Sequence, residues 1–274
     1  MISAGCDGII VCNSSDGIMP SIAKSCDENG VYLAQFFRNI EDPDVRSTVT
    51  ASDYFLGCTH EDEYNTGYKL GTALGDKGIT KVGYISWNHG DTTAEARYDG
   101  YTSAFADADI EILAEQWEIN TAEDGTRTAE NMMNAYPEME AIIVAGGSGE
   151  PLAGTITAVK NMNKVGDVVV VSTDFLSTLH EDFESGLMGA MSGGHFCDPL
   201  FSLMLVYNTI ATDGAFVSEP AEIKMDMVFV SSVEDVEAYE QAFVGSVLPY
   251  TAEEIQAMSV THTDGVTVQT LIDT

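Results

Sequence analysis

The stretch KVGYISWNHGDTTAEARYDGYTSAF, residues 81–105, decides the fold class. Residues 81–86 form a short apolar run typical of a buried strand, and residues 93–106 carry the pattern of a helix. The polar segment between them contains Trp87 and His89, and Arg97 lies near the start of the helix. Because open α/β sheets bind small molecules at the carboxyl ends of their strands, this segment is expected to face a ligand.

The same strand-and-helix unit recurs on both sides of this stretch. Further strands are expected at 7–13, 31–36, 51–58, 111–119, 141–145, 167–173, 187–192 and 221–230. Helices are expected at 16–29, 61–77, 124–135, 151–162, 177–184, 198–212 and 233–243, with a polar loop at 38–47 and a weakly periodic tail at 249–274. Strict alternation of strands and helices predicts an α/β fold with parallel sheets and right-handed crossovers.

The composition excludes several classes of protein. The chain has 274 residues, 45% of them hydrophobic, and no apolar run approaches the roughly 18 residues of a membrane helix. Its 44 acidic and 11 basic residues give a formal net charge of −33. Such a charge repels nucleic acid and anionic membranes, so no nucleic-acid partner and no membrane span are expected.

The cysteines give no sign of a metal site. The five cysteines are scattered, without a C-x-x-C pair or a Cys/His cluster, so neither zinc nor another metal or cofactor is predicted. An odd number leaves at least one thiol unpaired within the chain. The cysteines are interpreted as small buried apolar residues.

The loop AGGSGEP at 145–151 resembles two catalytic motifs and matches neither. A dinucleotide fingerprint needs glycine where Leu152 stands, and a nucleophile elbow needs glycine where Glu150 stands. The loop is interpreted as a strand-to-helix turn in which the amides of Gly147 and Ser148 face a ligand. His195 has no serine or cysteine partner in the pattern, so no enzyme is predicted.

Arginine is scarce, with four residues, and two of these follow predicted strands. Arg38 and Arg97 offer planar donor groups to hydroxyls or carboxylates, and Asp174 at the end of VVVVSTD offers an acceptor. Trp87 is placed to stack on a sugar or base. The alternatives are that each arginine pairs with a nearby acid, that Asp174 caps the next helix and that Trp87 packs on a lobe edge.

Five segments in order resemble the type I periplasmic sugar-binding proteins, whose type members bind ribose and galactose. They are GCDGIIVCNSSD (5–16), ENGVYLAQFFRN (28–39), TTAEARYDGYTSAF (92–105), AYPEMEAIIVAG (135–146) and VGDVVVVSTDF (165–175). The resemblance implies two Rossmann-like lobes with parallel sheets, joined by a three-stranded hinge and holding the ligand between them. The first lobe would be 1–59 and 196–220, the second 60–195 and 221–245, and 246–274 a C-terminal tail.

The resemblance also implies site residues, position by position. Arg38 and Arg97 match family arginines and Asp174 matches a family aspartate, whereas Phe37 and Asn120 stand where the family has an aspartate and a stacking aromatic. The Asn-Asp pair of the family falls on Gly146 and Gly147. Together with the residues at the strand ends, these positions make up the predicted ligand-binding residues, which are Phe37, Arg38, Trp87, His89, Arg97, Asn120, Gly147, Ser148, Asp174 and His195.

The family begins with a strand, a helix and a strand that have no counterpart here, so the first lobe is expected to be incomplete. Without that central strand, the sheet would expose an apolar edge. The expectation is that the chain is a fragment or a mis-started reading frame, or that another chain supplies the strand. The opening MISAGCDGIIVCN also has none of the features of a signal peptide.

The predicted function is that of an extracytoplasmic solute-binding protein, periplasmic or lipid-anchored at the cell surface. It would deliver a sugar, sugar acid, polyol or nucleoside to the permease of an ABC importer, with hinge closure around the ligand. The acidic tail resembles the endings of such proteins from Gram-positive bacteria, where a lipid anchor is usual. The alternatives are the ligand-sensing domain of a LacI-type regulator, which the charge disfavours, and that of a membrane sensor.

Overall fold

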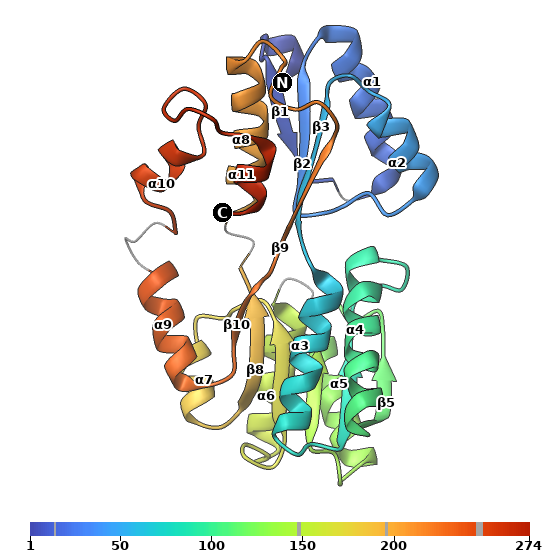
Figure 1. Cartoon of the computed structure of the whole chain (residues 1–274). Coiled ribbons are helices and arrows are strands. Elements are labelled where there is room, and N and C mark those ends of the chain that lie inside the picture. The colour runs from blue at the N-terminus through green and yellow to red at the C-terminus, as the bar shows by residue number, and fades with distance from the viewer. Residues whose placement is uncertain (14, 147–148, 195–196, 245–248) are drawn as a thin grey trace. The chain divides into compact units, whose positions relative to one another are not determined.

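The computed structural model describes residues 1–274 except 14, 147–148, 195–196 and 245–248 (Figure 1). The chain divides into two compact α/β units. Unit 1 comprises Met1–Glu61, His195–Met225 and Leu248–Thr274, and unit 2 comprises Asp62–Gly194 and Asp226–Val247. Unit 1 includes residues 221–225, which the sequence placed in the second lobe. It also includes residues 248–274 of the tail, which the sequence placed in a separate segment.

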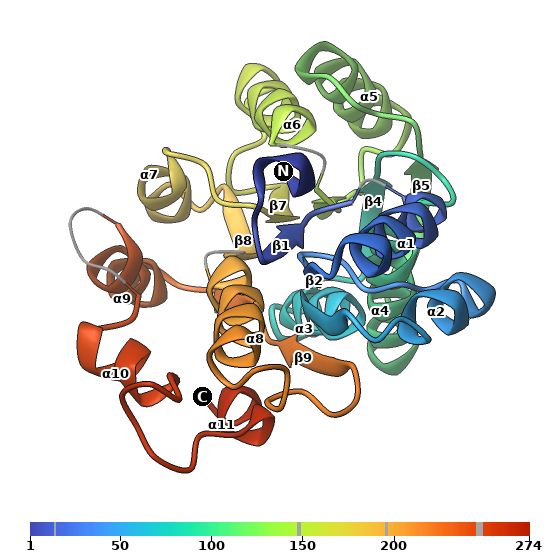
Figure 2. The same cartoon turned by 90° about the horizontal axis from the view of Figure 1, so that it is seen from above.

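Unit 1 is built on a parallel sheet of four strands. These are β1 (Gly8–Val11), β2 (Tyr32–Phe36), β3 (Phe55–Glu61) and β9 (Ala221–Met225), in the spatial order β1-β2-β3-β9. The helices are α1 (Met19–Asn29), α2 (Pro43–Thr50), α8 (Asp198–Ala211), α10 (Ala252–Ala257) and α11 (Val268–Ile272), with 3-10 turns at Ile2–Ala4 and Asp16–Ile18. Figure 2 shows α1 and α2 on one side of the sheet and α8 on the other.

Alternating side chains of this sheet fill two cores, one on each face. Leu33 and Phe55 pack with α1, whereas their neighbours Ala34 and Leu56 pack with α8. This alternation follows from the two-residue period of a strand. Met258 and Leu271, from the tail, are each 1% exposed and belong to the α8 core, so the tail packs into unit 1.

The sequence prediction was wrong for the segment expected to be a polar loop at 38–47. Helix α2 begins there at Pro43, and the carboxylate of Asp42 accepts hydrogen bonds from the backbone N–H groups of Asp44 and Val45, at 2.9 and 3.1 Å. An aspartate cap followed by proline in the first turn is a helix start signal, which the polar composition of the segment obscured.

Unit 2 is built on a mixed sheet. Its strands are β4 (Lys81–Ile85), β5 (Glu111–Gln116), β6 (Ala141–Val144), β7 (Val169–Thr173), β8 (Met188–Gly193) and β10 (Val228–Val230), in the spatial order β10-β8-β7-β6-β4-β5. The helices are α3 (Glu63–Asp76), α4 (Thr92–Ala108), α5 (Ala122–Ala135), α6 (Glu150–Asn161), α7 (Leu179–Glu184) and α9 (Val233–Phe243). Figure 2 shows α3 and α4 on the opposite side of this sheet from α5 and α6.

The sheets are mainly parallel, as the sequence predicts, and one strand departs from this direction, because β10 runs antiparallel to β8. The single strand expected at 221–230 is also two strands. Its first part, β9, pairs with β3 in unit 1, and its second part, β10, lies at the edge of the sheet of unit 2. The break falls at Asp226 and Met227, and the local pattern did not reveal it because apolar residues stand on both sides.

Two glycines let α3 and α4 pack unusually closely. A Cβ atom on Gly67 would lie 2.1 Å from the carbonyl oxygen of Arg97, and one on Gly100 would lie 2.1 Å from that of Tyr64. The absence of side chains at these points lets the backbones of the two helices approach each other closely. This contact positions Arg97 on α4 beside Glu63 on α3.

Candidate functional site

Polar side chains gather at the carboxyl end of the sheet in unit 1. Asn13 follows β1 and Gln35 lies near the end of β2, and they are 3% and 0% exposed. The side-chain amide of Gln35 donates a hydrogen bond to Asn13 Oδ1 at 2.7 Å. Among the described residues, Gln35 Oε1 and Asn13 Nδ2 have no hydrogen-bond partner. A buried acceptor and a buried donor without partners suit a ligand hydroxyl, which can both donate and accept.

Further polar groups surround this pair. The hydroxyl of Ser202, on α8, donates to the carbonyl oxygen of Gln35 at 2.8 Å and to Thr59 Oγ1 at 3.1 Å. Glu61 at the end of β3 and Asp198 at the start of α8 are also buried, with 3% and 1% exposure. Buried carboxylates and hydroxyls at one end of a parallel sheet are typical of a site for a polar small molecule.

The predicted residues Phe37 and Arg38 directly follow β2 in the same unit. Phe37 has a backbone φ of 71°, a left-handed conformation that is rare for a bulky residue. The guanidinium carbon of Arg38 lies 5.4 Å from the centre of the Phe37 ring, within range of a cation–π contact. Backbone strain of this kind concentrates at functional sites, which is consistent with a ligand role for this turn.

In unit 2, the predicted residue Arg97 is a buried side chain with defined partners. It is 3% exposed, and its Nε and Nη2 donate to the carboxylate of Glu63 at 2.6 and 3.1 Å. Its Nη1 donates to the carbonyl oxygen of Ala145 at 2.7 Å. Burial disfavours the charge, but the Glu63 carboxylate outweighs it, so the pKa of Arg97 is raised. The ion pair with an acid, which was the alternative interpretation, is present.

Three more groups lie around Arg97 at the carboxyl end of this sheet. The guanidinium carbon lies 5.6 Å from the ring centre of Trp87, which follows β4. A Cβ atom on Gly146 would lie 2.6 Å from Arg97 Nη1, so glycine is needed there. Asp174, with a φ of 81°, follows β7, and its charge also contributes to the raised pKa of Arg97. The structure therefore brings Trp87, Arg97 and Asp174 together.

The hydroxyl of Thr173 at this edge is buried and unsatisfied. Thr173, the last residue of β7, is 0% exposed, and its Oγ1 has no hydrogen-bond partner among the residues described. Like the Asn13–Gln35 pair in unit 1, it lies where a parallel strand ends. Each unit thus carries an unsatisfied buried polar group at the edge where α/β sheets bind ligands.

The remaining predicted residues are placed differently. His89 and Asn120 are exposed: the His89 ring stacks on Trp117 with ring centres 3.9 Å apart, and the Asn120 amide donates to Asn88 Oδ1 at 3.0 Å. These contacts join the loops after β4 and β5 to each other. Gly147, Ser148 and His195 lie outside the described residues.

Four residues at these edges were not predicted from the sequence, namely Asn13, Gln35, Thr173 and Glu63. A signal for the first two exists, because Gln35 interrupts the apolar run YLAQFF and Asn13 ends the run IIVCN. A polar residue in a strand that is buried on both faces has to find a hydrogen-bond partner. Glu63 has no such signal, since its pairing with Arg97 depends on the close packing of α3 and α4.

Within the described parts of the chain, no group of three or more His, Cys, Asp and Glu side chains gathers to hold a metal ion. None of the described helices has the length and apolar character needed to cross a membrane. All five cysteines are unpaired, with Cys26 and Cys58 buried and Cys12 exposed.

Solved structures of sugar-binding proteins share this fold. An ABC transporter periplasmic solute-binding protein from Actinobacillus succinogenes with bound D-allose matches with a TM-score of 0.73 and 20% identity, over 86% of this chain and 82% of that chain. The binding protein of the arabinose ABC transporter from Shewanella, bound to L-arabinofuranose, matches with a TM-score of 0.72 and 20% identity, over 88% and 78%. At this identity the likeness concerns the fold.

Sequence relatives agree with the structural ones. A D-allose-binding periplasmic protein of Escherichia coli is 33% identical over 184 residues, which are 65% of this chain and 56% of that protein. A D-ribose/D-allose-binding protein of Pseudomonas aeruginosa is 25% identical over 191 residues, 68% of this chain and 57% of that protein. The matched part is thus less than two thirds of each relative's length.

The match to the family itself covers more than half of the chain. The family model described as a periplasmic binding protein domain matches residues 1–194, which include Asn13, Gln35, Arg97 and Thr173. The fold, the two sequence relatives and this match all indicate the same group of proteins. The chain therefore belongs to the type I periplasmic sugar-binding protein family.

Proposed function

We propose that this chain is a solute-binding protein whose ligand is a small carbohydrate. The observation that carries the proposal is the set of buried, unsatisfied polar groups at the carboxyl ends of both sheets, namely Asn13 Nδ2, Gln35 Oε1 and Thr173 Oγ1. Leaving such groups without partners is costly, and ligand hydroxyls would satisfy them. We propose that these groups bind the hydroxyls of the ligand.

The chemistry of the two edges favours a molecule rich in hydroxyls. Unit 1 supplies an amide donor, an amide acceptor and the buried acids Glu61 and Asp198, whereas unit 2 supplies a hydroxyl and Asp174. Trp87 adds an aromatic face suited to the apolar side of a sugar ring. We favour a pentose or a hexose as the ligand over a polyol, a sugar acid or a nucleoside. The support is that the relatives are named for ribose and allose, and that the neighbours have bound D-allose and L-arabinofuranose.

The proposed role is delivery of this ligand to the permease of an ABC importer, outside the cytoplasm. The support is membership of a family whose named relatives and neighbours are periplasmic and belong to ABC transporters. Binding would close the hinge formed where the chain passes between the units. The two units would be the two lobes expected from the sequence, the protein would act without catalysis, and it would be periplasmic or lipid-anchored.

A thermal-shift screen against pentoses, hexoses, sugar acids, polyols and nucleosides tests the proposal. A ligand that binds only the folded chain, at a concentration of 100 times its Kd, stabilises it by about 2.7 kcal/mol, which raises the melting temperature by several degrees. A concentration-dependent shift with one sugar class is expected. A cooperative melt that no carbohydrate in the panel shifts would contradict the proposal.

A further inference from the structure

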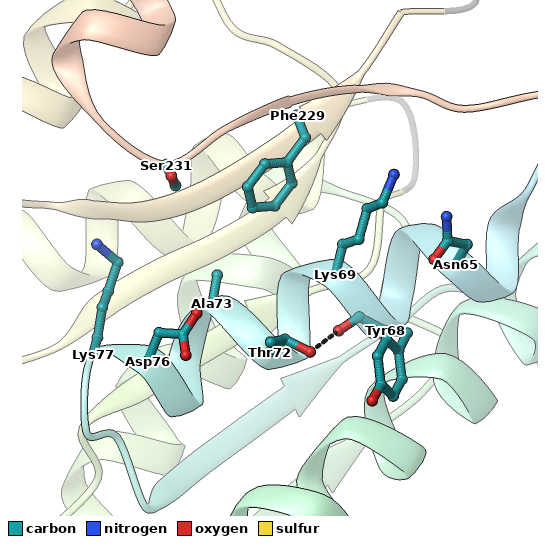
Figure 3. Close-up of a pocket in the computed structure, with 9 residues that line it drawn as sticks. All are labelled: Asn65, Tyr68, Lys69, Thr72, Ala73, Asp76, Lys77, Phe229 and Ser231. Atoms are coloured by element: carbon teal, nitrogen blue, oxygen red, sulfur yellow. Dashed lines mark hydrogen bonds between the residues drawn. The ribbon is translucent and has the colours of Figure 1, made fainter.

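Unit 2 also contains a hollow, on the flank of helix α3. It has a volume of about 670 Å³ and lies between α3 and the edge strand β10 (Figure 3). Its lining residues are Asn65, Tyr68, Lys69, Thr72, Ala73, Asp76, Lys77, Phe229 and Ser231. The hollow extends to Lys77 at the end of α3, and Glu63, the partner of Arg97, begins the same helix. A helix of 14 residues is about 21 Å long, so the far end of the hollow is remote from the strand-end site.

The positive charge of Lys69, at one end of this hollow, is neutralised within the protein. The ammonium group of Lys69 lies 2.8 Å from a carboxylate oxygen of Asp226, and the Asn65 amide donates to the other oxygen at 2.9 Å. Lys69 therefore has its counter-charge within the protein. A ligand gains little from a charge placed at this end.

The other end carries two opposite charges that are not paired. Among the described residues, the side chains of Asp76 and Lys77 form no ion pair or hydrogen bond with a partner or with each other. Both are exposed, and Figure 3 shows the Asp76 carboxylate and the Lys77 ammonium standing apart at one end of the hollow. Two of the seven lysines of this very acidic chain thus line a single hollow.

The middle of the hollow is apolar. The Phe229 ring, from β10, extends over it, and the methyl group of Ala73 lies on α3 opposite, as Figure 3 shows. Phe229 is partly buried against the core that α3 and α4 share. A molecule held at Asp76 and Lys77 would therefore place an apolar group against Phe229 and Ala73.

We propose that this hollow binds a free amino acid with a large apolar side chain. Its ammonium group would meet Asp76, its carboxylate would meet Lys77, and its side chain would cover Phe229 and Ala73. The volume lies within the range of about 300–1,000 Å³ that is usual for small-molecule sites. The net charge of −33 repels a simple anion. A simple cation would pair with Asp76 but not with Lys77. A zwitterion carries no net charge and can pair with both.

Titration of the full chain with L-phenylalanine, followed by saturation-transfer NMR, tests this site. Saturable binding in the millimolar range is expected, because exposed charges contribute little affinity. N-acetyl-L-phenylalanine, which lacks the ammonium group, and L-phenylalaninamide, which lacks the carboxylate, should each bind roughly fivefold more weakly, as the loss of about 1 kcal/mol requires. Absence of saturable binding to the folded chain, or equal binding of N-acetyl-L-phenylalanine, would overturn the proposal.

Variants locate the binding within the molecule. Asp76→Asn and Lys77→Met should each weaken L-phenylalanine binding by the same factor, and Ala73→Trp should abolish it by filling the hollow. Lys24→Met, which removes an exposed lysine on α1 in unit 1, serves as the matched control and should bind like the wild type. Circular dichroism melts confirm that each variant is folded. Full binding by a folded Ala73→Trp variant would also overturn the proposal.

Discussion

The Arg97 guanidinium is held by a buried ion pair, and this pair has a measurable effect on stability. Replacement of Arg97 by methionine leaves the Glu63 carboxylate, 12% exposed, and the Ala145 carbonyl without their donor. Breaking one partner of a buried pair costs about 3–5 kcal/mol. We expect Arg97→Met to lower the free energy of unfolding by about that amount. Urea denaturation followed by tryptophan fluorescence reports on unit 2, because both tryptophans, Trp87 and Trp117, lie there.

A matched arginine provides the control for this prediction. Arg127 pairs with Asp124 on the surface of α5, and its side chain is 64% exposed. Exposed pairs are worth about 0–1 kcal/mol, so Arg127→Met should be nearly neutral. The double variant Arg97→Met with Glu63→Leu should recover part of the lost stability, since no buried charge remains. Equal effects of Arg97→Met and Arg127→Met would show that the pair contributes little.

At the scale of single residues, the sequence identified positions better than roles. Arg97, Trp87 and Asp174 were found because they follow buried strands, and the structure does bring them together. What Arg97 contacts was not predictable, because Glu63 reaches it only through the packing of α3 against α4. Asn13 and Gln35 were overlooked although a polar residue inside an apolar run was visible. The ligand-binding roles of all these residues stay predictions.

At the scale of elements, glycine determines the contact between α3 and α4. A Cβ atom on Gly100 would lie 2.1 Å from the Tyr64 carbonyl oxygen and 2.7 Å from the Tyr68 nitrogen, both backbone atoms. Gly100→Ala should therefore destabilise unit 2 by about 1–3 kcal/mol, although alanine favours helices by about 1 kcal/mol. The measurement is urea denaturation followed by circular dichroism, which reports on both units. Gly17→Ala, where the nearest atom is 3.7 Å away, should be close to neutral, and similar effects of the two would refute close packing as the cause.

A second element-scale prediction concerns the beginnings of β4 and β6. The Glu140 carboxylate accepts hydrogen bonds from the backbone N–H groups of Thr80 and Lys81 and from the Thr80 hydroxyl, at 2.7, 3.1 and 3.0 Å. The Thr80 N–H is the largest cause that lowers the pKa of Glu140 below its ordinary value of 4.5. A lowered folded-state pKa stabilises the protein above the ordinary value, and this stability is lost as the pH falls through the folded-state pKa.

The Glu140→Gln variant tests this contribution. At neutral pH it should be less stable than the wild type by about 1 kcal/mol, which allows for solvent screening of the charge. The difference should shrink as the pH falls below 4.5, because the wild-type carboxyl group then becomes protonated. Denaturation curves at several pH values give the comparison, with the exposed residue Glu138 changed to Gln as control. A difference that does not depend on pH would contradict this explanation.

The elements themselves were largely predictable, and the errors have physical reasons. Helices such as α4 and α6 and strands such as β6 and β7 are long or strongly apolar, so their pattern alone located them. Helix α2 was missed because its polar residues concealed the cap at Asp42. The split of 221–230 and the antiparallel direction of β10 were missed because partner strands are fixed by tertiary pairing, which a local pattern does not record.

At the scale of the whole molecule, the order of five segments was more informative than any single motif. Each segment alone is a common strand-to-helix pattern, but their succession predicted the family, which the match over residues 1–194 and the related folds confirm. The ligand was not predictable at this level. One fold can serve many ligands, so the ligand depends on the side chains of the site rather than on the sheets.

We propose that the buried polar groups at the strand ends bind a carbohydrate. Isothermal titration calorimetry of D-allose and D-ribose tests it directly, with the wild type and with Gln35→Met and Thr173→Val, which keep similar shapes. We predict one sugar bound per chain, and an affinity lowered by roughly threefold to tenfold in each folded variant, as expected for one lost hydrogen bond. Saturable binding that neither substitution weakens, or no binding of any carbohydrate by the folded wild type, would contradict the account.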